Sequence, residues 1–227
     1  MSDPSATRDW NALEDEEFRR IAAAFFEEHV PQHLRYLSRR PRCRSTSHRE
    51  TSVIILNMIV KNEEHVIERC LDSVSGHVDD FVICDTGSTD RTPALVKERT
   101  GHYVYASNWI DFAHNRNIAL EILQCKHAGS DDVYVLFLDA DDQLVAGQGA
   151  LSGLTADAYT IKTRLGGIEY DRVALVKLSC CTRWVGPVHE YLEGTWSSAP
   201  VLSGVTIVAG VEGARSRDPD KYLKDAA

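Results

Sequence analysis

The stretch FVICDTGSTD, residues 81–90, joins an apolar run to the tetrapeptide Asp-Thr-Gly-Ser, which aspartic proteases also carry. Those proteases are all-β and need two such aspartates that face each other. This chain has one copy of the tetrapeptide, and the residues around it alternate between strand and helix patterns. We therefore interpret the stretch as a buried strand that ends at Asp85 and leads through a turn into a helix, not as part of a peptidase.

The same order of strand and helix continues on both sides of this stretch. Continuous apolar runs, typical of buried strands, lie at residues 52–60 and 132–139, and a shorter strand pattern lies at residues 102–106. Helical patterns separate these strands at residues 62–76, 88–101 and 111–125. The alternation predicts an α/β fold, in which helices flank both faces of a mostly parallel sheet.

The two ends of the chain carry other patterns. After residue 157, two strand patterns on either side of Gly166-Gly167 predict an antiparallel hairpin within a smaller antiparallel part. We expect residues 1–50 to form an N-terminal helical extension with a basic linker, and residues 51–210 to form the α/β domain. Residues 211–227 are expected to be a loop and the start of a helix, as if the sequence were truncated there.

Composition limits the classes of function. The chain has 227 residues, 43% of them hydrophobic, which suits a folded domain, and its net charge of −9 argues against nucleic-acid binding. Six cysteines without a C-x-x-C pair argue against a zinc ribbon and favour reduced thiols in the cytoplasm. We found no apolar run long enough to span a membrane and no signal segment in the sequence.

Acidic residues follow two of the predicted strands. Asp85 ends one strand, and VYVLFLDADDQL, residues 133–144, places Asp139, Asp141 and Asp142 after another. Ligands of open α/β sheets bind at this edge, and Gly87 would let the backbone approach a ligand. Clustered carboxylates repel each other unless a cation such as Mg²⁺ or Mn²⁺ neutralises them. The alternatives are an acidic turn and a cap for the following helix.

Five segments, in this order, resemble the family-two inverting glycosyltransferases. They are NMIVKNEEHVIERCLDSV, VICDTGSTDRT, FAHNRNIAL, LFLDADD and GPVHEYLEG, and they match the branch whose first strand reads M-I-V-K-N-E. The resemblance implies a GT-A fold, hexosyl transfer from a nucleotide-sugar donor, expected to be UDP-linked, and Mn²⁺ or Mg²⁺ held by a D-x-D motif. Asp139 and Asp141 match that motif.

The resemblance also implies roles for single residues in the donor site. Asp85 would bind the base, Asp139 the ribose or the cation, and Asp141 the cation. The other residues expected along the nucleotide are Asn57, Lys61, Glu63, Gly87, Arg116 and Asn117. Lys61 is equally interpreted as a surface lysine, and Arg116 and Asn117 as helix-surface residues.

The candidate catalytic residues are Glu190 and Asp142. Glu190 is expected to be the general base that inversion requires, while His189 would complete the metal shell, orient the acceptor or be structural. Arg215 and Arg217 near the end of the chain could pair with the diphosphate or belong to a solvated loop.

Two alternative functions remain possible from the sequence, and the sequence does not identify the acceptor. The stretch FLDADDQL also suits a haloacid-dehalogenase-like phosphatase, although Gln143 stands where that class has Thr or Val. A non-catalytic module that binds nucleotide sugars is the second alternative. The acceptor could be a glycan, a lipid-linked sugar, a peptide or a natural product.

Overall fold

The computed structural model describes residues 52–187, 189–217 and 219. The predicted helical extension and basic linker at residues 1–50, and the end of the predicted C-terminal helix, lie outside the described residues. Within the described part of the chain, no helix is long and apolar enough to cross a bilayer.

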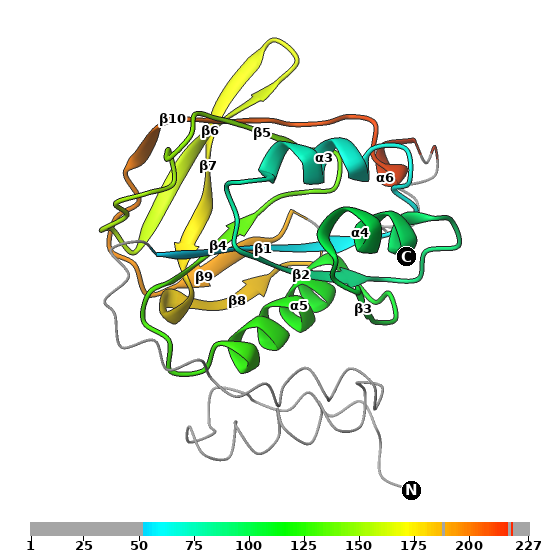
Figure 1. The fold of residues 1–227 in the computed structure, drawn as a ribbon, viewed down its shortest axis with the longest axis horizontal. Coiled ribbons are helices and arrows are strands. Elements are labelled where there is room, and N and C mark those ends of the chain that lie inside the picture. The colour runs from blue at the N-terminus through cyan, green and yellow to red at the C-terminus, as the bar shows by residue number, and fades with distance from the viewer. Residues whose placement is uncertain (1–51, 188, 218, 220–227) are drawn as a thin grey trace, which may run out of the picture. The chain divides into compact units, whose positions relative to one another are not determined.

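The first half of the fold is a parallel sheet built from the strands that the apolar runs predict (Figure 1). Its spatial order is β3-β2-β1-β4, and all three neighbouring pairs are parallel. The strands are β1 (Val53–Val60), β2 (Asp80–Asp85), β3 (Tyr105–Ala106) and β4 (Val133–Phe137). Because their carboxyl ends share one edge, the residues that follow these strands come together there.

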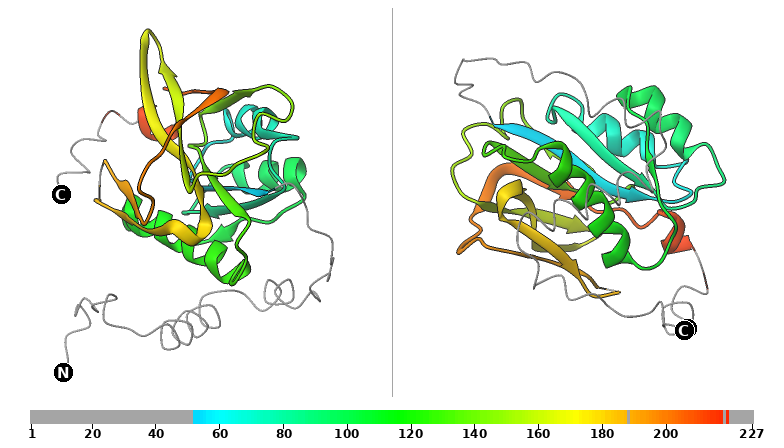
Figure 2. Two further views of the ribbon diagram at one scale, coloured as in Figure 1. Left: turned by 90° about the vertical axis from the view of Figure 1, so that its left-hand side faces the viewer. Right: turned by 90° about the horizontal axis from the view of Figure 1, so that it is seen from below.

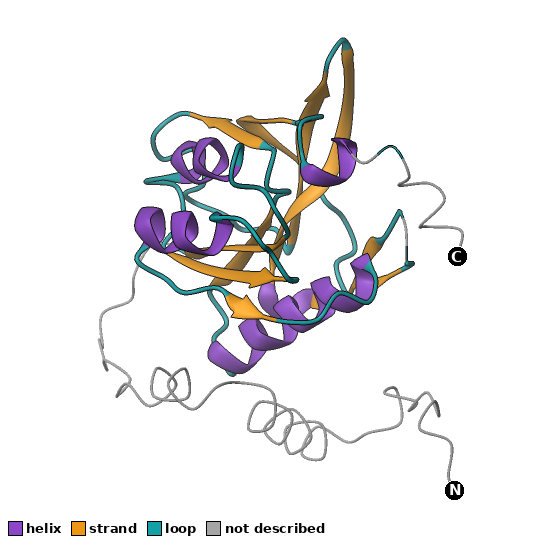
Figure 3. Cartoon of the chain, turned by 90° about the vertical axis from the view of Figure 1, so that its right-hand side faces the viewer, coloured by secondary structure: helices purple, strands orange, loops and turns teal. Residues whose placement is uncertain are grey.

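Helices cover both faces of this sheet (Figure 3). Helices α3 (Ile67–Val74) and α4 (Thr92–Thr100) pack on one face, and α5 (Phe112–Lys126) packs on the other. Strand β1 contributes Leu56 and Met58 to the apolar cluster that includes residues of α3 and α4, and Ile55 to the cluster that includes residues of α5. Burial on both faces explains why β1 is apolar along its length, and it confirms the predicted α/β fold.

Helix α3 begins five residues later than its pattern predicts. Asn62 adopts a left-handed backbone with φ of 56°, and its N–H donates to Ser88 Oγ at 2.9 Å. Asn62 Oδ1 also accepts the N–H of Thr89 at 2.7 Å. The predicted first turn of this helix is therefore a loop that is joined to the loop after β2.

The second half of the sheet is mixed, and it contains the predicted hairpin. The order continues β4-β7-β6-β10-β5, where β6 and β10 are parallel and the other pairs antiparallel. The hairpin of β6 (Ala158–Leu165) and β7 (Ile168–Lys177) projects from the body of the domain (Figure 2). The remaining elements are β5 (Gln143–Ala146), the 3₁₀ turn η3 (Leu178–Cys180), β8 (Cys181–Val185), β9 (Tyr191–Gly194), β10 (Val201–Val208) and α6 (Ala214–Arg217).

Candidate active site

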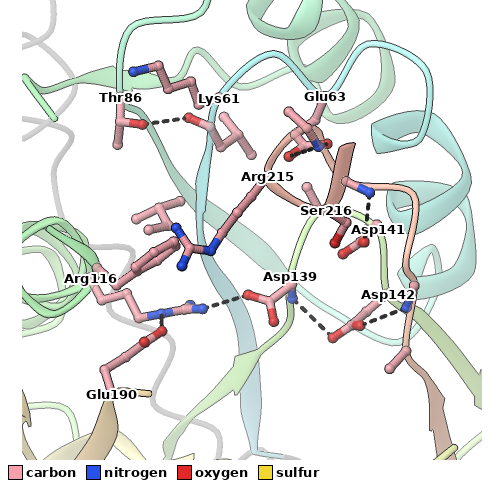
Figure 4. Close-up of a pocket in the computed structure, with 18 of the residues that line it drawn as sticks. Lys61, Glu63, Thr86, Arg116, Asp139, Asp141, Asp142, Glu190, Arg215 and Ser216 are labelled. Atoms are coloured by element: carbon pink, nitrogen blue, oxygen red, sulfur yellow. Dashed lines mark hydrogen bonds and ion pairs between the residues drawn. The ribbon is translucent and has the colours of Figure 1, made fainter. Parts of the chain in front are cut away.

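A pocket of about 870 Å³ opens at the carboxyl ends of β1 and β4. Its walls come from the loop after β1, the start of α5, the turn after β4, the β6–β7 hairpin and residues 189–190. Residues 209, 210 and 213–216, from the segment after β10, line one side, and Figure 4 shows this segment joined to Asp141 of the turn after β4 by a hydrogen bond. Residues 213–216, in the segment that we expected to be a loop and the start of a helix, therefore contribute to this pocket.

Arginines neutralise two of the three aspartates that follow β4. Arg116 Nη2 lies 2.6 Å from Asp139 Oδ1, and Arg172 Nη2 lies 2.7 Å from Asp142 Oδ2. Arg172 Nη1 is also 3.6 Å from Asp139 Oδ2. The repulsion that led us to expect a cation is thus relieved within the protein, so this repulsion by itself is no argument for a metal ion.

Asp142 is among the residues that line the pocket, but its side chain is almost fully buried and supports the turn. It is 2% exposed, and its carboxylate accepts the N–H of Asp139 at 3.2 Å in addition to the Arg172 contact. Burial raises the pKa of Asp142, and the nearby Asp139 carboxylate adds to the increase. The structure brings this catalytic candidate to the site, in a position that orients Asp139.

Asp139 and Asp141 face the pocket in different surroundings. Burial opposes ionisation of Asp139, but Arg116 and Arg172 outweigh it and lower its pKa. Asp141 Oδ2 accepts the N–H of Gly213 at 2.9 Å. A Cβ at Gly213 would lie 2.9 Å from that same oxygen, so a larger residue there would have to displace the Asp141 carboxylate.

Glu63 holds the same C-terminal segment from the loop after β1. Both of its carboxylate oxygens lie 3.1 Å from the N–H of Ala214. Burial raises the pKa of Glu63 to about 7, and the Asp141 charge contributes to the increase, while the Ala214 hydrogen bond opposes it. Glu63 therefore lines the pocket as expected, with its carboxylate already bonded to the segment.

Arg116 joins the carboxylates on the two sides of the pocket. Its Nε lies 2.7 Å from Glu190 Oε1, while its Nη2 holds Asp139, as Figure 4 shows. The guanidinium also lies 5.0 Å from the ring centroid of Trp184. Burial disfavours the charge, but Asp139 and Glu190 keep the pKa of Arg116 above its usual value. Arg116 fixes the distance between the expected metal ligand and the expected base.

Asp85 and Gly87 do not line this pocket, unlike their neighbour Thr86. Asp85 is 8% exposed, and its carboxylate accepts hydrogen bonds from the N–H groups of Gly87 at 3.4 Å and Ser88 at 3.1 Å. The Ser88 hydroxyl also donates to it. In the structure the Asp85 carboxylate therefore closes its own turn, and it does not cap α4, which begins at Thr92.

Three other expected donor residues have partners away from the pocket. The Asn57 side chain donates to Ala119 O at 3.0 Å, and the Asn117 side chain donates to Trp184 O at 2.9 Å. Arg217 is exposed and lies 3.0 Å from His65 Nδ1. Asn57 and Asn117 join elements of the fold, which explains why polar residues stand inside a buried strand and along α5.

His189, Lys61 and Arg215 do line the pocket. His189 is exposed and has a left-handed φ of 57°. In the described part of the chain, no group of three or more His, Cys, Asp and Glu side chains is arranged to hold a metal ion. Asp139 and Asp141 nevertheless fit Mg²⁺ or Mn²⁺, because these ions use one or two carboxylates and take other oxygens from phosphates and water.

Sequence reasoning missed several lining residues, among them Arg172, Trp109 and Phe112. Arg172 could have been found from the strand pattern. It lies two residues before Ala174 in β7, so the two side chains point to the same face of the sheet, and Ala174 is fully buried. A charged residue on a buried face needs a partner of opposite charge. Trp109 precedes the helix in a segment without periodicity, so its pattern gave no indication of a site.

Two curated relatives match parts of this chain. A TPR repeat-containing protein of Synechococcus elongatus is 33% identical over 150 residues, which cover 62% of this chain and 35% of that protein. An uncharacterised glycosyltransferase of Rickettsia bellii is 32% identical over 94 residues, 41% of this chain and 29% of that protein. The chain thus spans about a third of the length of these relatives.

A solved structure and a family model complete the comparison. Glucosyl-3-phosphoglycerate synthase from Mycobacterium tuberculosis, in complex with Mg²⁺ and UDP, matches with a TM-score of 0.35 and 21% identity, over 51% of this chain and 44% of that one. The model of the family "Glycosyl transferase family 2" matches residues 53–148, which include β1 to β5 and the aspartates after β4. Residues 53–148 of this chain are therefore similar to glycosyl transferase family 2.

Proposed function

We propose that this chain transfers a sugar from a nucleotide-sugar donor to the hydroxyl of an acceptor, with inversion at the anomeric carbon. The observation that carries the proposal is the meeting of Asp139, Asp141 and Glu190 in one pocket. The first two lie in the family 2 segment, and Glu190 reaches the pocket from outside it. Two carboxylates for a cation and a third beside them are what a metal-assisted transfer with a general base requires.

The donor's diphosphate would lie between the aspartates and the cationic wall of the pocket. Lys61 and Arg215 both line this wall, and their charges suit phosphate oxygens. The uracil base and the hexose of the donor are also part of this proposal. They come from the family resemblance, because the charges of the pocket select neither a base nor a sugar. The proposal does not include Arg217 in the donor site, because its guanidinium contacts His65 and the residue does not line the pocket.

Asp139 and Asp141 would hold a divalent cation, Mg²⁺ or Mn²⁺, with the diphosphate oxygens. When bound there, the cation would supply Lewis-acid stabilisation of the charge on the leaving diphosphate. Asp141 keeps one oxygen on the Gly213 N–H, which orients the carboxylate before a ligand arrives. Glu63 holds the adjacent Ala214 and so keeps the same segment against the pocket.

Glu190 is proposed as the general base. The acceptor hydroxyl oxygen attacks the anomeric carbon in line with the bond to the diphosphate, and Glu190 takes the hydroxyl proton. The bonding electrons of the broken C–O bond leave with the diphosphate. Arg116 holds Glu190 Oε1 and Asp139 at once, so it positions the base relative to the leaving group.

The proposal is tested by a screen of nucleotide sugars for hydrolysis, because an active transferase usually loses some sugar to water. We expect Mn²⁺-dependent release of sugar from at least one donor, and loss of that release in Glu190→Gln. Donor binding without release in any condition would indicate a non-catalytic module. Release of phosphate from simple phosphoesters, without donor hydrolysis, would support the phosphatase alternative and contradict the proposal.

A further inference from the structure

Two aromatic residues in the lining of the pocket pack against each other. Trp109 and Phe112 both line it, and their rings meet edge to face, with centroids 4.8 Å apart and planes at 82°. Trp109 is 39% exposed, which is high for a residue that usually buries most of its surface. A single exposed aromatic residue needs no explanation, but a packed pair at the wall of a pocket offers flat apolar surface to a ligand.

The loop that carries Trp109 is held from the inside by Asn115. This side chain is fully buried, accepts the N–H of Ile110 at 3.0 Å, and donates to Ser107 Oγ at 3.1 Å and Asn108 O at 2.8 Å. All three bonds go to the loop that contains Trp109. The exposed ring is thus supported by a buried polar residue, an arrangement that lowers the cost of ordering a binding surface.

Cationic side chains stand beside both rings. Lys61 Nζ lies 5.8 Å from the Trp109 ring centroid, and the Arg215 guanidinium carbon lies 4.6 Å from that of Phe112. Phe112 and Arg116 are four residues apart on α5, so they share a face of the helix one turn, about 5.4 Å, apart. From the aromatic pair to Asp139, the pocket therefore presents flat apolar surface, then positive charge, then carboxylate.

Two polar side chains at and after the end of β2 already make bonds within the fold. The Asp85 carboxylate is bonded to Gly87 and Ser88, and the Thr86 hydroxyl donates to Val60 O at 3.2 Å. Both groups can still accept a hydrogen bond, but neither has a free O–H or N–H to donate to the carbonyl oxygens of a base.

We propose that Trp109, supported by Phe112, is the stacking wall for the base of the nucleoside diphosphate, and that this wall accepts different bases with similar affinity. The inference rests on the proposed function and adds how the base is recognised. Stacking tolerates different bases because each has a π-face, whereas hydrogen bonds to a base edge distinguish them. The wall places the base on the Phe112 side of Arg116, with Lys61 and Arg215 beside the phosphates.

Calorimetric titrations in Mn²⁺ with UDP, GDP and inorganic pyrophosphate test this inference on the full chain. In Trp109→Ala, the Kd for UDP and GDP should rise by roughly 5- to 150-fold, the range expected for one lost base–aromatic stack. Pyrophosphate has no base, so its Kd should not change. Trp109→Phe should restore most of the affinity for both nucleotides, and the wild-type Kd values for UDP and GDP should agree within about tenfold.

Tyr103→Ala is the matched control. Tyr103 is 56% exposed and has Lys97 Nζ 4.2 Å from its ring centroid, yet it does not line the pocket. This variant should bind all three ligands as the wild type does, and its thermal unfolding should show that both alanine variants are folded.

Three results would overturn the inference or its basis. UDP binding that is unchanged in Trp109→Ala would overturn the stacking wall. A preference for UDP over GDP of more than about 100-fold, lost in Asp85→Asn, would show recognition by hydrogen bonds and contradict base tolerance. Both results leave the proposed transferase standing. If no nucleoside diphosphate binds in Mn²⁺, the proposed function itself fails.

Discussion

Strands β2 and β4 each lead into an aspartate at the same edge of the sheet, and the two carboxylates are held in different ways. Asp85 takes its hydrogen bonds from residues two and three positions along the chain. Asp139 is held by arginines 23 and 33 positions away, on α5 and β7. The hydrogen bonds of Asp85 hold it within its own turn. The arginines that hold Asp139 come from distant elements, and they leave it in the lining of the pocket.

The two regions also differ in what covers them. Asp139 keeps 44% of its side-chain surface exposed and lines the pocket with Asp141, while Asp85 does not line it. The position of an aspartate at a strand end therefore does not decide its function. Its partners do, and the following predictions probe the partners on the β4 side first.

The largest effect is expected at the proposed base. Glu190→Gln keeps the shape of the side chain and can still accept a bond from Arg116, but it cannot take a proton. We expect kcat to fall roughly 10²- to 10⁴-fold, with the Kd for the donor unchanged. Single-turnover kinetics together with donor titration would separate the two quantities. A loss of donor binding with normal kcat would show that Glu190 belongs to the donor site.

The second prediction concerns the arginine that joins both sides of the pocket. Arg116→Gln leaves Asp139 and Glu190 without their shared guanidinium, so we expect a loss of about 10- to 100-fold in kcat/KM. Arg116→Lys keeps the charge but lacks the planar fork that holds two carboxylates at once, and it should recover only part of the loss. Full activity in Arg116→Gln would contradict the positioning role.

The third prediction compares a supported carboxylate with a surface pair. Arg172→Gln leaves the buried Asp142 without its ion pair, and we expect about 2 kcal/mol less free energy of unfolding, below the cost for a fully buried pair because 28% of the Arg172 side chain is exposed. The control is Arg164→Gln, whose partner Glu169 is exposed, and it should leave the free energy of unfolding nearly unchanged. Equal losses in urea unfolding would show that Asp142 needs no partner.

The smallest effect is a change of stability with pH at Glu63. Its pKa is about 7 in the folded chain and 4.5 in its ordinary state, so the folded chain binds more protons between these values. The contribution of Glu63 to stability is therefore largest below about pH 4.5 and declines as the pH rises to about 7. In Glu63→Gln the melting temperature should fall less over this range. An identical pH profile in the variant would rule out this assignment.

The sequence predicted the parts of the fold that depend on local pattern. The apolar runs identified β1, β2 and β4, because burial on both faces of a parallel sheet demands continuous apolar residues. The Gly166-Gly167 turn likewise identified the β6–β7 hairpin. Helix α3 was predicted too long, since the backbone at Asn62 bonds to the loop after β2, a contact that no periodicity records.

The candidate site was predicted in part, for the same physical reason. Asp139, Asp141 and Glu190 could be placed at one pocket because strand ends and matched motifs locate them. The partners of Asp85, Asn57 and Asn117 are hydrogen bonds that depend on side-chain direction, and spacing alone does not give that direction. Arg172 shows the converse, since it reaches the aspartates from a hairpin far along the chain.

Binding of UDP to the wild type, Asp141→Asn and Asp85→Asn, measured with and without Mn²⁺, tests the central claim most directly. Asn at either position keeps an oxygen that can accept a backbone N–H, so both variants should fold. We predict that Mn²⁺ strengthens UDP binding in the wild type and in Asp85→Asn, and has no effect in Asp141→Asn. Mn²⁺-dependent binding that survives in Asp141→Asn and is lost in Asp85→Asn would contradict the account.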